Sequence, residues 1–132
     1  MDAICVDPAR IHEIWPHVSK LIRLAMTRME LSEFAVVEKS VLSGDALLWV
    51  AQDKTIAAAA VTELSLVDGE KYCTIVACAG EESNRWLHLI ERIEEFGQAE
   101  GCRAMRIWGR KGWARALPDY DTHALVLQKE LT

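Results

Sequence analysis

The sequence predicts an α/β (α+β) fold with a mixed, mostly antiparallel sheet of five to six strands flanked by helices. Two observations support this prediction. Apolar residues recur at helical spacing up to about residue 42, and the pattern then changes to short apolar runs separated by two-residue turns. A strongly amphipathic helical stretch follows at residues 84–100. The chain has 132 residues, enough for one hydrophobic core and too few for two, so we expect residues 1–132 to form a single domain.

The N-terminal part of the sequence predicts one short strand and two helices. Asp7 and Pro8 are typical of a helix start, as N-cap and first-turn residue. Pro16 lies inside the same helix and should kink or divide it. Gly44 is placed to end the second helix. The expected elements are a strand at residues 3–6 and helices at residues 8–28 and 31–42.

The rest of the sequence predicts three antiparallel strands, a long helix, a further strand, a short helix and a last strand. Asp53-Lys54 and Asp68-Gly69 separate three apolar runs, which favours a three-stranded meander. The four alanines at residues 57–60 would let a neighbouring element pack closely. Cys73 and Cys78 are an odd number of positions apart and are therefore expected on opposite faces of their strand. The expected elements are strands at residues 47–52, 56–67, 72–79, 103–108 and 123–131, a long helix at 84–100 and a short helix at 113–117.

Composition and charge exclude several classes of function. The formal net charge is −5, which argues against a nucleic-acid-binding domain. No apolar run approaches the roughly 20 residues that span a bilayer. The first residues do not resemble a signal peptide, so a cytoplasmic location is expected. The four cysteines form no Cys-x-x-Cys pair, and we expect reduced thiols and no metal site.

The positive charge is concentrated in residues 103–115, where no acidic residue occurs. Two interpretations are open. The segment could form a cationic rim for an anion or for the acidic surface of a partner. It could instead be a solvated edge whose arginines pair with the glutamates of the preceding helix. The basic residues are Arg103, Arg106, Arg110, Lys111 and Arg115.

The order of the expected elements and two stretches of sequence resemble the GNAT-type N-acetyltransferase superfamily. The stretch IERIEEFGQAEGCRAMRIWG, residues 90–109, is similar to the long helix and following strand of that superfamily, and LVLQKEL, residues 125–131, to its last strand. The stretch GRKGWARAL, residues 109–117, resembles a subset of GNAT-like proteins from phages and prophages. The resemblance implies acetyl-CoA as cofactor, in a V-shaped opening between the fourth and fifth strands.

The resemblance implies that backbone groups hold most of the cofactor. Amides of the loop that opens the long helix would bind the pyrophosphate, where the helix dipole favours an anion. The superfamily's loop reads Gln/Arg-x-x-Gly-x-Gly/Ala, whereas residues 81–86 read Glu-Glu-Ser-Asn-Arg-Trp. Two carboxylates there would repel the pyrophosphate by roughly 1 kcal/mol or more per close pair, so a degenerate phosphate cradle is expected. The implied cofactor-binding residues are Ile75, Val76, Ala77, Cys78, Gly80, Ser83 and Asn84, with Arg110 and Lys111 toward the phosphates.

The resemblance also implies a general acid and a general base. The superfamily often uses a tyrosine on the helix before the last strands as the acid for the leaving thiolate. Arg115 stands at that position here, and Tyr120 is the tyrosine nearest to it. The base is commonly a glutamate on the central strands, for which Glu63 is the candidate, with Glu70 as the other glutamate in that region. Glu63 and Tyr120 are therefore the catalytic candidates.

Two functions from different classes follow. The first is an acyl-CoA-dependent N-acyltransferase (an acetyltransferase), of weakened or lost activity if the phosphate cradle is degenerate, with a small-molecule or protein amine as acceptor. The second is a non-catalytic GNAT-fold binding or assembly protein, of phage origin. The sequence ends one strand short of the superfamily's usual pair, so an edge near residues 124–128 could pair with a second copy to give a homodimer.

Overall fold

The computed structural model describes residues 2–27, 33–80, 83–108, 113–122 and 127–131. Its elements occur in the predicted order of strand, two helices, three strands, long helix, strand and short helix, with small shifts of the boundaries. They are β1 (Asp2–Cys5), η1 (Pro8–Arg10), α1 (Ile11–Met26), α2 (Phe34–Ser43), β2 (Leu47–Gln52), β3 (Ile56–Val67), β4 (Glu70–Gly80), α3 (Ser83–Ala99), β5 (Ala104–Ile107) and α4 (Trp113–Ala116). None of the helices described is long and apolar enough to cross a membrane.

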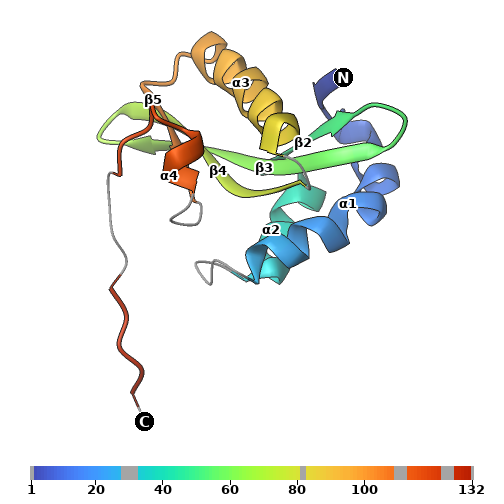
Figure 1. The fold of residues 1–132 in the computed structure, drawn as a ribbon, viewed down its shortest axis with the longest axis horizontal. Coiled ribbons are helices and arrows are strands. Elements are labelled where there is room, and N and C mark those ends of the chain that lie inside the picture. Colours follow the sequence, from blue (N-terminus) through green and yellow to red (C-terminus); the bar gives the residue numbers. More distant parts are fainter. Residues whose placement is uncertain (1, 28–32, 81–82, 109–112, 123–126, 132) are drawn as a thin grey trace.

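The five strands form one sheet in the order β1-β2-β3-β4-β5. Every neighbouring pair is antiparallel except β4 and β5, which are parallel. The helix α3 provides the crossover between those two strands and covers one face of the sheet, while α1 and α2 cover the other (Figure 1). The mixed, mostly antiparallel fold predicted from the sequence is confirmed, with five strands.

The alternation of side chains along the strands builds two separate hydrophobic cores. On the α1/α2 face, Val18, Ile22 and Val41 pack against residues of β2, β3 and β4 that include Val61 and Val76. On the α3 face, the apolar side of α3 packs on Trp49 and the alanines of β3. The members of this second core are Trp49, Ala51, Ala58, Ala60, Cys73, Ile75, Cys78, Leu89, Ile90 and Ile93. The predicted close packing over the alanine run is thus made by α3.

Pro16 does not divide the first helix, which was one of the two effects expected of it. Asp7 caps η1 as predicted, its side chain accepting a 2.9 Å hydrogen bond from the Ala9 amide. The α-helix then runs from Ile11 to Met26 through Pro16. Pro16 is on the exposed side of α1, so water can satisfy the backbone carbonyl that loses its partner there. Gly44 ends α2 in the left-handed conformation, with φ of 87°, as the sequence predicts.

The strand predicted at residues 123–131 is not found in the part that the structure describes. Residues 127–131 have no strand assignment, and the segment extends away from the sheet in Figure 1. Leu127 and Leu131 are 90% and 88% exposed. The prediction was wrong for this part because alternating apolar residues favour a strand only where another strand offers a hydrogen-bonding edge. Residues 123–126 lie outside the described residues.

The prediction that Cys73 and Cys78 lie on opposite faces of their strand was also wrong. Both side chains belong to the core under α3. The pairing of β3 with β4 shifts by one residue between Val61 and Thr62, which face Ala77 and Ile75. Val76 is therefore an additional residue in β4, a β-bulge, and it reverses the alternation of every residue that follows it. All four cysteines are free, and Cys73 and Cys78 are buried.

Candidate functional site

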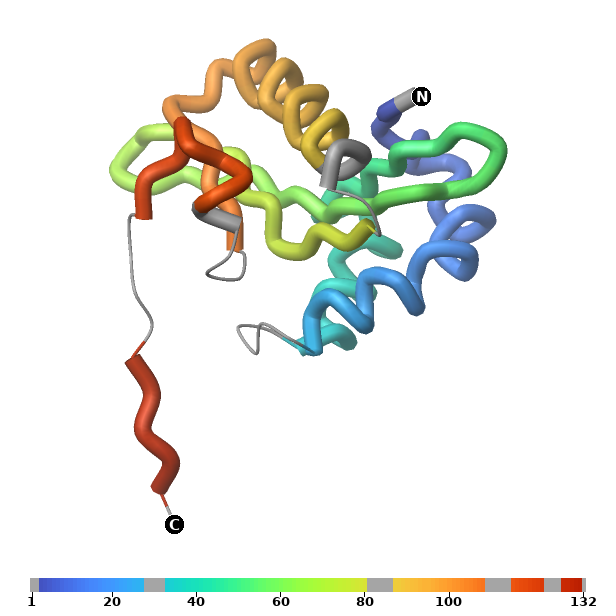
Figure 2. Tube along the Cα trace, viewed as in Figure 1, coloured from blue at the N-terminus to red at the C-terminus, as the bar shows by residue number. Residues whose placement is uncertain are grey.

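The candidate site is the place where β4 and β5 separate. The two strands pair from Tyr72↔Ala104 to Ile75↔Ile107, and the last hydrogen bond runs from the Trp108 amide to the Ile75 carbonyl at 3.0 Å. β4 continues to Gly80, paired with β3 on its other side. In the tube view β4 continues beyond the region where it lies beside β5 (Figure 2). Within the described residues, the β5-facing edge of β4 thus has no strand partner from Val76 onward.

The β-bulge lies at the apex of this opening and redirects the backbone of β4. Val76 and Ala77 both belong to the core under α1 and α2, whereas Ile75 and Cys78 belong to the core under α3. Bulges bend their strand and increase its local twist. The bulge therefore bends β4 at the residue that follows the last pair with β5. This feature was missed by sequence reasoning, because a strand buried on both faces is apolar throughout and its alternation gives no signal.

The structure brings most of the predicted cofactor-binding residues to this edge. Ile75, Val76, Ala77 and Cys78 are all buried, so their side chains are committed to the two cores and only their backbone groups can serve a ligand. Gly80 ends the strand, where an added Cβ would lie 3.0 Å from the Ala58 Cβ. A larger residue there would therefore crowd β3.

The N-terminus of α3 follows this edge directly. The helix begins at Ser83 and includes Asn84, while residues 81–82 lie outside the described residues. Leu89, Ile90 and Ile93 anchor α3 in the core, so its first turn is held beside the end of β4. The free amides and the dipole at such a helix start favour an anion. Arg110 and Lys111, the predicted phosphate contacts, lie outside the described residues.

The two catalytic candidates lie on opposite faces of the sheet. Glu63 pairs with Thr74 and has the orientation of Val61, which faces α1 and α2. Tyr120 lies on the α3 face, where its hydroxyl donates a 2.6 Å hydrogen bond to Glu94 Oε2 of α3. The structure does not bring these two side chains together. Their catalytic roles stay predictions.

Tyr120 connects the C-terminal segment to α3. Burial raises the pKa of its phenol, and the hydrogen bond and charge of Glu94 raise that pKa further. The Tyr120 amide also donates to the Leu117 carbonyl at 3.0 Å, and Leu117 packs against the core under α3. The phenol is therefore held in its protonated form, with its proton directed to Glu94.

We expect Tyr120→Phe to lower the free energy of unfolding by about 1–2 kcal/mol, because it removes a partly buried hydrogen bond to a carboxylate. Urea unfolding followed by circular dichroism measures this change. Tyr72→Phe is the matched control, because the Tyr72 hydroxyl makes no hydrogen bond within the described residues, and it should cost less than about 0.5 kcal/mol. Equal losses for the two variants would contradict the role given to the Tyr120–Glu94 bond.

The arginines of the basic segment do not pair with the glutamates of the preceding helix in the described part of the chain. Arg103 Nη1 lies 3.4 Å from Glu70 on β4, and the Arg106 guanidinium carbon lies 4.0 Å from the centroid of the Tyr72 ring. Glu94 and Glu95 of α3 contact Tyr120 and Arg92 instead. Glu100, which follows the helix, pairs with Lys71. The solvated-edge interpretation therefore holds only in part, with Arg103 paired to a strand residue.

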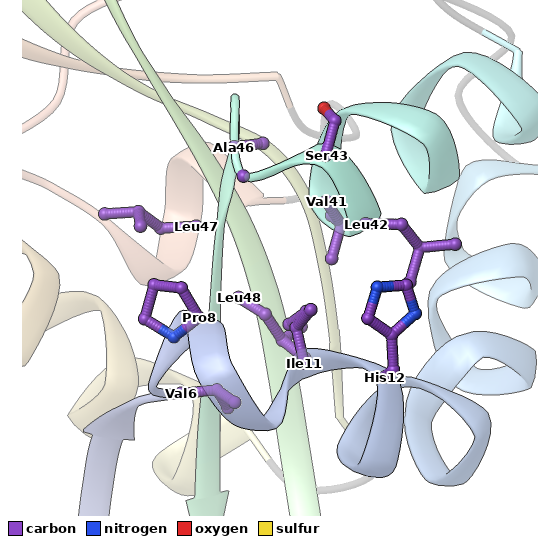
Figure 3. A pocket seen from close by; sticks show the side chains of 11 residues that line it. Val6, Pro8, Ile11, His12, Val41, Leu42, Ser43, Ala46, Leu47 and Leu48 are labelled. Carbon is purple, nitrogen blue, oxygen red and sulfur yellow. The ribbon is translucent and has the colours of Figure 1, made fainter.

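A small apolar hollow lies away from the β4 edge (Figure 3). It has a volume of about 130 Å³ and is bounded by the start of α1, the end of α2 and β2. Val6, Ile11, Val41 and Leu48 point into it, with His12 at its rim. It borders β2, which β3 separates from β4. No cluster of three or more His, Cys, Asp or Glu side chains that could hold a metal ion occurs among the residues described.

Comparison with solved structures identifies this architecture. A structure described as a probable acetyltransferase superposes with a TM-score of 0.72 at 9% sequence identity, covering 100% of this chain and 99% of that chain. An aminoglycoside acetyltransferase from an uncultured soil metagenomic sample, in complex with sisomicin, gives 0.69 at 13% identity, with 99% and 96% covered. The chain has the GNAT acetyltransferase fold.

A third structure with the GNAT fold is a predicted acetyltransferase from Clostridium acetobutylicum, solved with acetyl-CoA. It has a TM-score of 0.66 and 10% identity to this chain, covering 99% of this chain and 95% of that one. No protein-family model matches the sequence, and no curated protein matches it. The likeness is therefore one of fold, at full length and at low sequence identity.

Proposed function

We propose that the protein is an acyl-CoA-dependent N-acyltransferase that binds acetyl-CoA along the free edge of β4. One observation carries this proposal. The pairing of β4 with β5 ends at Ile75 and Ile107, directly before the bulge at Val76, and the remaining backbone of β4 has no strand partner on that side among the residues that the structure describes. A solved structure with the same fold contains acetyl-CoA, which supports this choice of ligand.

The chemistry of this edge suits the pantetheine arm of coenzyme A. An unpaired strand edge presents a row of backbone N–H and C=O groups. The arm is an extended chain with two amides, so it can add to the edge much as a peptide strand does. The start of α3 would then receive the pyrophosphate. Ser83 and Asn84 supply amides there, and Arg110 and Lys111 supply positive charge.

The proposed reaction is direct attack of an amine on the thioester. The nitrogen lone pair forms the new C–N bond to the acyl carbon, and the electron pair of the C–S bond leaves on sulfur. The proton lost by the nitrogen balances the proton taken up by the thiolate. The resemblance to the superfamily makes Glu63 the proposed base for the amine and Tyr120 the proposed acid for the thiolate, which requires Tyr120 to give up its hydrogen bond to Glu94.

A second function remains supported by the sequence of the loop before α3. Residues 81–86, which match the superfamily's pyrophosphate loop, contain no glycine, and Glu81 and Glu82 place two carboxylates where a pyrophosphate would approach. In this alternative the chain is a GNAT-fold binding or assembly protein without transferase activity, of the phage-associated kind. Pairing between copies through the C-terminal segment would give a homodimer, with Leu127 and Leu131 available to it.

Calorimetric titration of the full chain with acetyl-CoA separates the two functions. We expect saturable binding, and roughly tenfold weaker binding for Arg110→Ala and Lys111→Ala, because each removes a charge-assisted contact to phosphate. Arg103→Ala is the matched control, because its side chain is exposed and pairs with Glu70. An absence of binding at millimolar acetyl-CoA would overturn the transferase and favour the binding protein.

A further inference from the structure

Three charged or polar side chains form one row across β3, β4 and β5. Glu63 pairs with Thr74, and Thr74 pairs with Arg106. Adjacent strands are about 4.8 Å apart, so the backbones at Glu63 and Arg106 are separated by about 10 Å. The row ends one residue before the Ile75↔Ile107 pair, where β4 and β5 separate. It therefore borders the apex of the proposed acyl-CoA site.

The row lies on the α1/α2 face, next to the apolar core that those helices form with the sheet. On this face the apolar core reaches Val61 on β3 and Val76 on β4. The next residues along β3 and β4 that point to this face are Glu63 and Thr74, which pair with each other. Thr74 also pairs with the charged Arg106 on β5. Their neighbours Ile75 and Ile107 instead belong to the α3 face. This face of the sheet therefore changes from apolar to polar between Val61 and Glu63 on β3 and between Val76 and Thr74 on β4.

Within the described residues, the side chains of the row make no hydrogen bond or ion pair with the rest of the protein. Thr74 is buried, with 8% exposure, and its hydroxyl makes no hydrogen bond to the described residues. Neither Glu63 nor Arg106 makes an ion pair within 4.0 Å in that part of the chain. Arg106 is held by stacking on the Tyr72 ring, which occupies the face of the guanidinium and leaves its N–H groups available.

We infer that this row binds the acceptor, and that the acceptor is an amino acid or a small molecule carrying both an ammonium and a carboxylate. The inference rests on the proposed function, whose acceptor site it defines. Arg106 matches a carboxylate, because its planar fork of N–H donors suits two oxygens. Glu63 matches the ammonium and accepts the proton that the nitrogen must lose before it attacks the thioester. The Thr74 hydroxyl lies between the two charges and can hydrogen-bond to either group.

Direct binding measurements test the inference without relying on catalysis. The full chain is titrated by calorimetry with each of the twenty proteinogenic amino acids and with their α-amides, in the presence and in the absence of acetyl-CoA. We expect at least one amino acid to bind, and its amide to bind roughly tenfold or more weakly, because the amide lacks the charge that Arg106 recognises. Thr74→Val should weaken binding of the acid with little change in the fold.

Variants at Arg106 assign the preference to that side chain. Arg106→Gln should bind the acid and the amide with equal affinity, and Arg106→Lys should retain part of the preference because it keeps the charge without the fork. Arg103→Gln, whose arginine pairs with Glu70, should behave as the unaltered protein. Circular dichroism and thermal melting check the fold of each variant.

The outcomes separate this inference from the proposed function. Equal affinity for acid and amide in the unaltered protein, an unchanged preference in Arg106→Gln, or no binding of any amino acid would overturn the acceptor assignment. Acetyl-CoA binding accompanied by any of these results leaves the proposed function in place. Binding of amino acids with the expected preference, but without acetyl-CoA binding, would support the row as a ligand site and overturn the transferase.

Discussion

Trp49→Ala is expected to lower the free energy of unfolding by about 3–5 kcal/mol, the range for removing a large aromatic side chain from a packed core. Trp49 is the largest of the fully buried side chains described, with 0% exposure. It packs edge-on against Phe96 of α3 at 5.2 Å between ring centroids, and its indole Nε1 donates a 3.0 Å hydrogen bond to the Thr62 hydroxyl. The substitution therefore removes contacts that join β2, β3 and α3.

Two further variants divide this cost into its parts. Trp49→Phe keeps an aromatic ring but leaves the buried Thr62 hydroxyl without its donor, so a smaller loss of about 1–3 kcal/mol is expected. Trp108→Ala removes a tryptophan that is 38% exposed and should cost much less than Trp49→Ala. Urea unfolding is followed by far-ultraviolet circular dichroism, because the variants change the fluorescence. A loss below about 1 kcal/mol for Trp49→Ala would contradict the packing of α3 on the sheet.

The second large effect is a loss of stability at alkaline pH. Burial raises the pKa of the Cys78 thiol to about 12 and that of Cys73 to about 11, the latter with a contribution from the charge of Cys102. An unfolded thiol ionises near pH 9. Above that pH the unfolded chain binds fewer protons than the folded chain, so the free energy of unfolding falls as pH rises. Below about pH 9 both thiols are protonated in the folded and in the unfolded chain, so they give the free energy of unfolding no pH dependence.

The size of the alkaline effect follows from proton linkage. The buried Cys78 contributes a decrease of up to about 1.4 kcal/mol per pH unit between roughly pH 9 and 12. The raised pKa of Tyr120 adds a decrease of the same sign above about pH 10. Urea unfolding under reducing conditions from pH 7 to 11 measures the profile. Cys78→Ala removes one group that loses its proton on unfolding, so the free energy of unfolding should fall less per pH unit in this variant. An identical fall would contradict the burial of the Cys78 thiol.

Local signals in the sequence predict most of the secondary structure. Asp7 and Gly44 mark the start of η1 and the end of α2 because capping depends on a few neighbouring residues. The Asp68-Gly69 turn predicts the β3–β4 hairpin for the same reason, and both of its residues have positive φ. The apolar spacing of residues 84–100 likewise predicts α3. These elements need no knowledge of what lies across the sheet.

The features that form the candidate site depend on pairing between distant strands, and the sequence does not specify them. The bulge at Val76 is visible only from the register with β3, and the separation of β4 from β5 only from the end of their pairing. The row of Glu63, Thr74 and Arg106 joins residues 43 positions apart, which local patterns cannot relate. The alternating pattern of the C-terminal segment favours a strand, but residues 127–131 pair with no strand among the described residues.

Hydrogen exchange of the β4 amides is the measurement that tests the central claim most directly. In the free protein, we expect the amides of residues 76–80 that face β5 to exchange faster than those of residues 73–75, which β5 protects. Saturating acetyl-CoA should slow exchange at residues 76–80 and at the start of α3, and leave residues 47–48 beside the apolar hollow unchanged. Protection confined to the hollow, or no change anywhere in β4, would contradict binding of acetyl-CoA at the free edge of β4.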